Sequence, residues 1–320
     1  MTSTPRPLRI VLLGGPGYVG RLLAQRLRAD GNEVRVLSRN PGKHAERLLA
    51  PGADVRQCDV HSQSQLRDAF AGSDAVVNLV GILNEPGDSG RGFQKAHVEL
   101  TRTVVAACTE AGVRRLLQMS ALNAGRGSSH YLKSRGEAEA VVRASGLDWT
   151  ILQSSVMFGR GDGLFSRFAA LLDALPVIPL ARAGCRFAPV FVGDVVEAFA
   201  RALANPAAIG QTYELYGPQV FTLGEIVRMT ARQRGQHRLV LPLPDVLGRA
   251  QGFVFDFVPG KPFSSDNYRS LLSDSVGGVD GLHRLGIEPT PVSAVLPDIL
   301  GHALARQPRF DRNRATSQSH

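Results

Sequence analysis

A glycine-rich turn between an apolar run and a helical pattern is the feature that most constrains this fold. The segment LRIVLLGGPGYVGRLLAQRL (8–27) begins with a short apolar run typical of a buried parallel strand. Its glycines match both G-x-x-G-x-x-G and G-x-G-x-x-G, and apolar residues at helical spacing follow. Glycines allow the backbone to approach a pyrophosphate closely, and the N-terminus of the following helix attracts it. The segment therefore predicts dinucleotide binding, with a plain strand-to-helix turn as the alternative. The predicted contacts are Gly14, Gly15, Gly17, Tyr18, Val19 and Gly20.

Strand and helix patterns alternate along the first half of the chain. Helical patterns cover 94–111 and 131–145, and apolar strand patterns cover 8–15, 33–39, 53–60, 74–81, 113–121 and 148–155. This alternation predicts an α/β fold with a doubly wound parallel sheet, the Rossmann fold, and a smaller C-terminal lobe. Ligands of such sheets bind at the carboxyl ends of the strands.

The expected domains follow from changes in pattern along the 320 residues. Residues 1–155 are predicted to form an NADP(H)-binding Rossmann domain, to which 189–206 returns. Prolines and glycines interrupt the chain after residue 155, so 156–304 is predicted to form a smaller lobe for a substrate or partner. Residues 305–320 are basic and poor in apolar side chains, which predicts a disordered tail.

The end of the second predicted strand indicates which cofactor binds. An NAD site usually has a carboxylate there for the ribose 2′-hydroxyl, but this chain has Ser38, Arg39 and Asn40. Because a guanidinium pairs well with a 2′-phosphate, NADP(H) is preferred, with NAD(H) possible and a surface arginine as the alternative. Further cofactor contacts are predicted at the ends of other strands, at Asp59, Val60, Asn78, Gly81 and Gln153.

Charge and composition limit the remaining function classes. The net charge is +9, yet the basic residues are spread along the chain and no aromatic–basic motif is present, so no nucleic-acid partner is expected. Three scattered cysteines lack metal-ligand spacing, so no metal site is predicted. We find neither a signal peptide nor an apolar run of the roughly 18 residues that a membrane helix needs. The expected location is the cytoplasm, with peripheral binding at the inner face of a membrane possible and the oligomeric state open.

Several motifs together resemble the atypical short-chain dehydrogenase/reductase superfamily. They are the glycine turn, CDV (58–60), NLVG (78–81), the SA (120–121) to YLKSR (131–135) pair and PVFVGDV (189–195). With SSVMFGRGDGLFSRFA (154–169) and the late stretch 266–300, the chain is similar to the complex I accessory family of alpha-subcomplex subunit nine and its bacterial relatives. The resemblance covers about residues 8–300. It implies tight NADPH binding and, by analogy with the mitochondrial member, a structural role.

The catalytic candidates are Ser120, Tyr131 and Arg135. In catalytic members of the superfamily a lysine stands four residues after the tyrosine and lowers its pKa, and a serine orients the substrate. Here Arg135 keeps the charge of that lysine but not its compact shape. A second departure is QSS (153–155), where relatives more often show Arg-Pro-Ser, so Gln153 and Ser154 differ from the residues usual on the nicotinamide side. Two hypotheses remain open: a structural or redox-sensing protein linked to respiratory or quinone-related machinery, and an active NADPH-dependent reductase or epimerase acting on an isoprenoid-like or sugar-nucleotide substrate.

Overall fold

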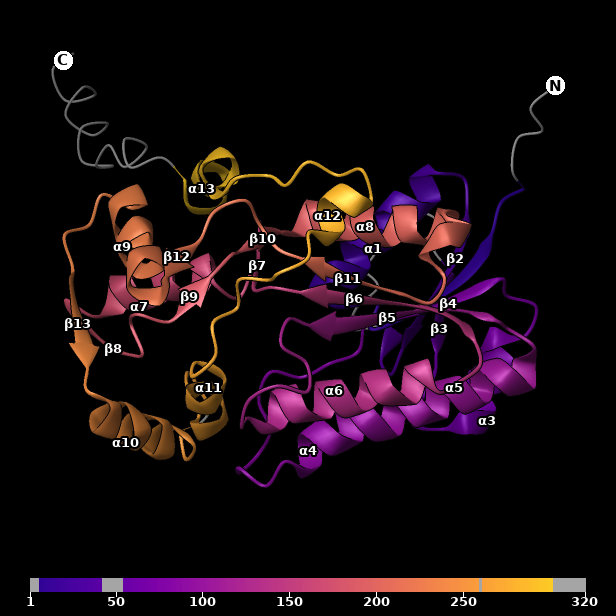
Figure 1. Ribbon diagram of the computed structural model, residues 1–320, viewed down its shortest axis with the longest axis horizontal. Coiled ribbons are helices and arrows are strands. Elements are labelled where there is room, and N and C mark those ends of the chain that lie inside the picture. Colours follow the sequence, from indigo (N-terminus) through magenta and orange to yellow (C-terminus); the bar gives the residue numbers. More distant parts are fainter. Residues whose placement is uncertain (1–5, 42–53, 259–260, 302–320) are drawn as a thin grey trace, which may run out of the picture.

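A computed structural model describes residues 6–41, 54–258 and 261–301 of the chain, and a seven-stranded parallel sheet lies at its centre (Figure 1). The predicted α/β fold with a doubly wound sheet is confirmed. The strand order is β11-β6-β5-β4-β1-β2-β3. The strands are β1 (Arg9–Leu13), β2 (Glu33–Ser38), β3 (Asp54–Gln57), β4 (Ala75–Asn78), β5 (Arg115–Ala121), β6 (Asp148–Ser154) and β11 (Gln211–Leu215).

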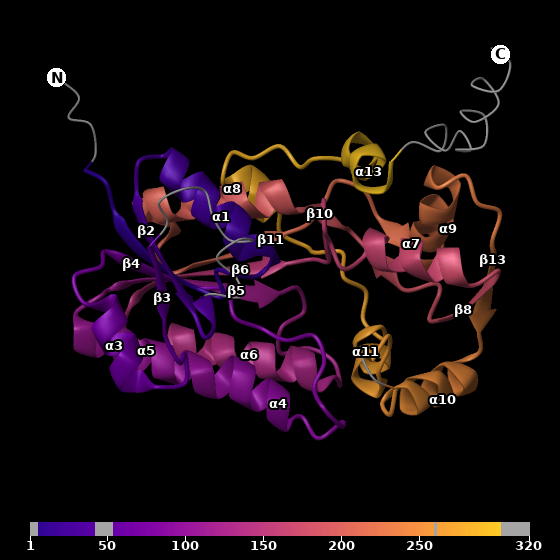
Figure 2. The ribbon, with the colours of Figure 1, turned by 180° about the vertical axis from the view of Figure 1, so that it is seen from behind.

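Helices cover both faces of this sheet (Figures 1 and 2). One face carries α1 (Tyr18–Ala29), α8 (Val192–Ala204) and the short α12 (Gly281–Arg284). The other carries α3 (Gln63–Phe70), α5 (Leu100–Ala111) and α6 (His130–Arg143). The central strands are buried on both sides, which explains why their sequences read as continuous apolar runs.

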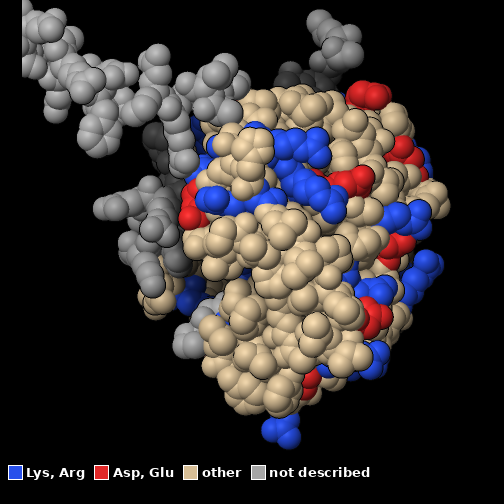
Figure 3. Space-filling view, turned by 90° about the vertical axis from the view of Figure 1, so that its left-hand side faces the viewer, with Lys and Arg blue, Asp and Glu red and all other residues tan. Residues whose placement is uncertain are grey.

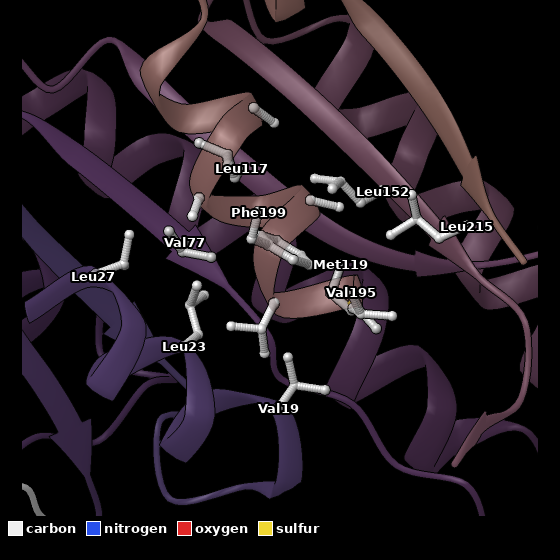
Figure 4. Close-up of a cluster of buried hydrophobic side chains, with 14 of the residues drawn as sticks. Val19, Leu23, Leu27, Val77, Leu117, Met119, Leu152, Val195, Phe199 and Leu215 are labelled. Atoms are coloured by element: carbon white, nitrogen blue, oxygen red, sulfur yellow. The ribbon is translucent and has the colours of Figure 1, made fainter. Parts of the chain in front are cut away.

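The main hydrophobic core lies between the sheet and the helix pair α1 and α8. Leu23 of α1 and Phe199 of α8 point toward Val77 of β4 and Leu117 of β5 in this layer, and all four side chains are at most 1% exposed (Figure 4). The core therefore joins α1 and α8, whose residues Leu23 and Phe199 lie 176 positions apart in the sequence. It fixes the glycine turn at the start of α1 against the ends of the central strands.

The seventh strand comes from a segment that the sequence patterns did not indicate. Within 189–206, the helix α8 packs on the sheet, but β10 (Val190–Phe191) pairs with β7 (Met157–Phe158) in a separate two-stranded sheet. The strand that returns to the main sheet is β11, which pairs in parallel with β6. The short η2 (Pro206–Ala208) connects α8 to β11.

The smaller lobe lies beyond the carboxyl ends of the central strands (Figure 1). Two apolar clusters hold it together, one around Leu172, Ile178 and Val227 and the other around Phe158, Phe165 and Val292. Its elements are α7 (Phe165–Ala174), β8 (Val177–Ala181), β9 (Arg186–Phe187), β12 (Phe221–Thr222), α9 (Leu223–Gln233), β13 (Leu239–Leu243), α10 (Asp245–Phe255), α11 (Ser265–Ser270) and α13 (Val292–Leu300). The predicted tail, 305–320, lies outside the described residues.

The outer end of the lobe carries an unusual amount of exposed apolar surface. Val246 and Phe253 of α10 and the nearby Phe257 are each more than 60% exposed, whereas the two buried residues of α10 are Gly248 and Gly252. Figure 3 shows a broad area without charged side chains at this end, bordered by basic and acidic side chains above it and along its right edge. No helix in the described part of the chain is both long and apolar enough to cross a membrane.

Candidate functional site

A cleft of about 510 Å³ lies at the carboxyl ends of the central strands, between the sheet and the smaller lobe. The sheet order reverses there, because β1 lies between β2 and β4, and ligands of doubly wound folds bind at such a reversal. Nine of the predicted site residues line this cleft. They are Gly14, Gly17, Tyr18, Val19, Gly20, Gly81, Ser120, Tyr131 and Arg135.

The glycine turn has the geometry that a pyrophosphate requires. The N–H of Gly17 donates to the carbonyl of Gly14 at 2.9 Å, which closes the turn. A Cβ on Gly20 would lie 2.5 Å from the Gly14 oxygen, so a larger residue there would push α1 away from the turn. Gly17 is the N-cap of α1, and no side chain caps this end of the helix. The free N–H groups and the helix dipole therefore face the cleft and fit a phosphate.

The glycine turn also places a tyrosine in the cleft. Tyr18 is partly buried, and its hydroxyl has no hydrogen-bond partner among the described residues. Burial raises the pKa of this hydroxyl, and the negative charge of Asp162 acts in the same direction. The neutral phenol can therefore donate a hydrogen bond to a ligand in the cleft.

The end of β2, predicted to select the cofactor, carries no carboxylate at Ser38, Arg39 or Asn40. Arg39 is exposed, and Ser38 is buried with its Oγ accepting the N–H of Asn40 at 3.2 Å. Arg39 forms no hydrogen bond or ion pair with the described residues. The segment 42–53, which follows it closely in the sequence, is not among the described residues. The exposed guanidinium is therefore available to an anionic group of a ligand.

The other predicted strand-end contacts have local partners. The Oδ1 of Asp59 accepts the N–H of His61 at 3.1 Å, and Asn78 donates to Gln118 at 3.0 Å. Gln153 donates to the buried carboxylate of Glu139 on α6 at 2.8 Å. These residues do not line the cleft, and neither do Gly15, Ser38, Arg39 and Val60.

Ser120 and Tyr131, predicted as catalytic residues, face the same cleft. Ser120 is 4% exposed, and its Oγ has no hydrogen-bond partner among the described residues. The ring of Tyr131 packs edge-on against Phe93 and His97, with centroids 6.0 Å and 5.7 Å away. Because a buried hydroxyl without a partner is costly, the Oγ of Ser120 fits a polar atom of a bound ligand.

Arg135, one helical turn after Tyr131, is bound to the protein backbone. Its Nη1 donates to the carbonyl of Met119 at 3.2 Å and to that of Val80 at 3.4 Å. Its guanidinium carbon lies 5.6 Å from the centroid of the Tyr131 ring. Arg135 thus keeps a positive charge near the tyrosine. Its guanidinium, however, is hydrogen-bonded to the backbone at the ends of β4 and β5 and so connects them to α6. Lys133 is exposed and does not line the cleft.

His97 is a site neighbour that the sequence patterns did not reveal. It lies in a π-helical turn, η1 (Gln94–Glu99), between α4 (Arg91–Phe93) and α5, and such turns are frequent at functional sites. Its Nε2 accepts the N–H of Ile82 at 3.2 Å, so its Nδ1 carries the proton and bonds to the Oγ of Ser134 at 2.8 Å. Burial lowers the pKa of His97 to about 2, and the charge of Arg135 adds to this effect.

Asp266 connects the smaller lobe to the helix that carries Tyr131. Its carboxylate accepts the N–H groups of His130 and Tyr131, at 2.6 Å and 3.1 Å, at the start of α6. Arg269 bonds to Asp266 at 3.0 Å and also pairs with Asp88 in the segment after β4. A position in the lobe therefore fixes the first turn of α6.

A cluster of three possible metal ligands lies at this position, although no metal site was predicted. The cluster consists of Asp88, His130 and Asp266. Their ligand atoms lie within 4.8 Å of one another. Both carboxylates already pair with Arg269, and Asp266 accepts two backbone N–H groups. The positive charge of Arg269 among these oxygens opposes the binding of a cation.

Comparisons with known proteins agree with this geometry. Residues 14–161 match the model of an NAD(P)H-binding family. The chain is 30% identical over 300 residues to NADH dehydrogenase [ubiquinone] 1 alpha subcomplex subunit 9 of Rattus norvegicus, covering 90% of this chain and 78% of that protein.

Two solved structures share the fold. One is the NADPH complex of the quinone oxidoreductase QOR2 from Escherichia coli, with a TM-score of 0.72 and 22% identity over 89% of this chain and 97% of that one. The other is the NAD complex of UDP-glucose 4-epimerase from Thermus thermophilus, with a TM-score of 0.63 and 23% identity over 82% and 99% of the two chains. The chain belongs to the family of the complex I alpha subcomplex subunit 9, within the atypical short-chain dehydrogenases/reductases, and its first half matches an NAD(P)H-binding model.

Proposed function

We propose that this protein holds NADP(H) as a stabilising or redox-sensing cofactor and that its catalytic relay is degraded. The observation that carries the proposal is the position of Arg135. Its guanidinium binds the carbonyls of Met119 and Val80, whereas an active relay needs a compact ammonium beside the tyrosine and the cofactor ribose. Loss of one tuned proton-transfer partner typically lowers the rate by about 10²- to 10⁴-fold, and it leaves the glycine turn intact.

The preference for NADP(H) over NAD(H) rests on the end of β2. The exposed guanidinium of Arg39 carries the only charge among residues 38–40, and a ribose hydroxyl would find no carboxylate among them. A 2′-phosphate would pair with Arg39 through charge-assisted hydrogen bonds. The proposed cofactor contacts in the cleft are Gly14, Gly17, Tyr18, Val19, Gly20 and Gly81.

The proposed biological setting is the respiratory NADH dehydrogenase or related quinone machinery. Membership of the subunit 9 family supports an association with such a complex. The exposed apolar side chains of α10 and the excess of basic residues would suit a protein held at the inner face of a membrane by a protein complex. The rest of the surface would then face the cytoplasm.

Parallel measurements of cofactor binding and turnover test the proposal. The purified protein is titrated with NADPH, and NADPH oxidation is then followed with a panel of quinones, ketones and aldehydes. We expect NADPH to bind and its oxidation to stay at the rate without protein. Turnover of any panel member at the ordinary enzyme rate of about 1 s⁻¹ or more would overturn the claim of a degraded relay.

An active reductase or epimerase is the second candidate, and Ser120 favours it. The unpartnered Oγ of Ser120 faces the same cleft as Tyr131, as a substrate-orienting serine would. In that case Arg135 would substitute for the lysine through its charge. Substrate-dependent NADPH oxidation that disappears in Tyr131→Phe, while NADPH binding stays unchanged, would establish this candidate.

A further inference from the structure

The side of the cleft that faces the smaller lobe has an apolar wall. Ile82 follows β4, Met157 lies in β7, Phe187 lies in β9 and Leu271 follows α11, and all four line the cleft. They come from four separate segments, so apolar side chains meet a bound molecule from several directions. Such walls are typical of sites that take molecules with a large apolar surface.

Charged groups are almost absent from this cleft. Among the described residues that line it, Arg135 is the single charged side chain, and its Nη1 is bound to two backbone carbonyls. The polar side chains on the lobe side are serines, of which Ser275 lies 3.3 Å from the Oγ of Ser155. The glycine turn and the free start of α1 would be taken by the diphosphate of the cofactor. A second diphosphate would then find no cationic partner in the lining, and burying its charges without one is costly, so the cleft disfavours a sugar nucleotide beside the cofactor.

Three polar atoms of residues that line the cleft have no hydrogen-bond partner among the described residues: the hydroxyls of Tyr18 and Ser120 and the Nε of Arg135. The side chain of Ser120 is only 4% exposed, and its Oγ forms no hydrogen bond with the described residues. A hydroxyl in this position can donate to a neutral acceptor such as a carbonyl oxygen. Tyr131, in the first turn of α6, also lines the cleft. An apolar wall with the free hydroxyl of Ser120 beside it fits an uncharged ring that carries a carbonyl group.

We propose that this compartment binds an uncharged, mainly apolar carbonyl compound, of which a quinone ring is the representative class. The inference deepens the proposed function, on which it rests, because it assigns a ligand class to the cleft beside the cofactor. The apolar ring would contact Phe187 and Leu271, and a ring oxygen would accept a hydrogen bond from Ser120.

Equilibrium dialysis tests the inference without turnover. The full chain, saturated with NADP⁺, is dialysed against tetramethyl-1,4-benzoquinone, whose fully substituted ring does not add thiols, and separately against UDP-glucose. We expect retention of the quinone at least tenfold tighter than that of UDP-glucose. Equal or tighter binding of UDP-glucose, or no retention of the quinone by cofactor-loaded protein, would overturn the inference. Failure to take up NADP⁺ at the first step would instead count against the proposed function.

Two adjacent leucines provide a matched pair of variants. Leu271 lines the cleft, whereas Leu272 is 44% exposed and does not. Leu271→Glu is expected to weaken quinone binding at least tenfold, and Leu272→Glu to leave it within twofold. An equal effect of both variants would contradict the assigned position. If Leu271→Glu fails to fold, judged by circular dichroism and NADP⁺ uptake, Phe187→Ser replaces it with the same expected loss.

Discussion

The guanidinium of Arg135 occupies the space that a side chain at position 81 would need. A Cβ built on Gly81 would overlap the Nη2 of Arg135, so glycine at the end of β4 and arginine on α6 are sterically matched. The same guanidinium binds carbonyls at the ends of β4 and β5. Arg135 is therefore part of the framework of the cleft, although it stands at the position of a catalytic lysine.

Substitution of Gly81 tests this match. Gly81→Ala should lower the free energy of unfolding by about 1–3 kcal/mol, because the extra methyl group forces Arg135 off its carbonyl partners. Urea unfolding measures the change. Gly163→Ala is the matched control, since Gly163 also lines the cleft and a Cβ there meets no atom within 4 Å. Equal effects at the two glycines would show that Arg135 does not restrict position 81.

Arg39 should control the discrimination between the two cofactors. Removal of its side chain in Arg39→Ala should weaken NADPH binding by about tenfold, or 1.4 kcal/mol, and leave NADH binding unchanged. Fluorescence titration with each cofactor measures the ratio. Arg67→Ala is a suitable control, because Arg67 is an exposed arginine of α3 that pairs with its neighbour Asp68. An unchanged NADPH affinity in Arg39→Ala would remove the argument for NADP(H).

Asp266 should stabilise the first turn of α6 from the smaller lobe. Asp266→Ala leaves the N–H groups of His130 and Tyr131 without their acceptor and should cost about 1–2 kcal/mol, as loss of a helix cap does. Asp266→Asn keeps one carbonyl oxygen and should cost less. Thermal unfolding of both variants gives the order, and an Asn variant as destabilised as the Ala variant would show that the acceptor oxygen is not what matters.

His97 should make the protein less stable as the pH falls below about 6.5. Its pKa in the folded chain is lowered to about 2, so between these values the unfolded chain binds one proton more than the native chain. The free energy of unfolding should therefore fall by about 1.4 kcal/mol for each pH unit from this group. The decline between pH 7 and pH 5 should be shallower in His97→Gln.

His283 provides the control for this pH dependence, because Asp280 and Glu288 raise its pKa. A group whose pKa is raised on folding adds stability at low pH and loses it as the pH rises. His283→Gln should therefore not reduce the loss of stability in acid. A decline with the same slope in wild type and His97→Gln would contradict the assignment to His97.

The sheet could be predicted because its signals are local. The glycine turn and the apolar runs of β1, β2, β4, β5 and β6 each lie within a few residues of chain. The strand β11, QTYEL, mixes polar and apolar residues, and only its pairing with β6, some 60 residues earlier, makes it part of the sheet. Strand pairing over such distances depends on packing of the whole fold and leaves no local pattern.

In the candidate site, too, the residues in local motifs could be predicted, and the contacts between distant segments could not. Ser120 and Tyr131 follow recognisable strand-end and helix motifs, and both line the cleft. The role of Arg135 as a clamp on carbonyls depends on two other strands, and the contacts of Asp266 with α6 span about 136 residues of sequence. A lone histidine such as His97 in an amphipathic helix looks like any core or surface residue until its partners are known.

A titration of the purified protein with NADPH tests the central claim most directly. The account predicts saturable binding, seen as a rise in NADPH fluorescence, with an affinity at least tenfold higher than for NADH. Absence of binding of either dinucleotide up to millimolar concentrations would contradict it, because the glycine turn, the free end of α1 and the cleft would then serve some purpose other than holding the cofactor.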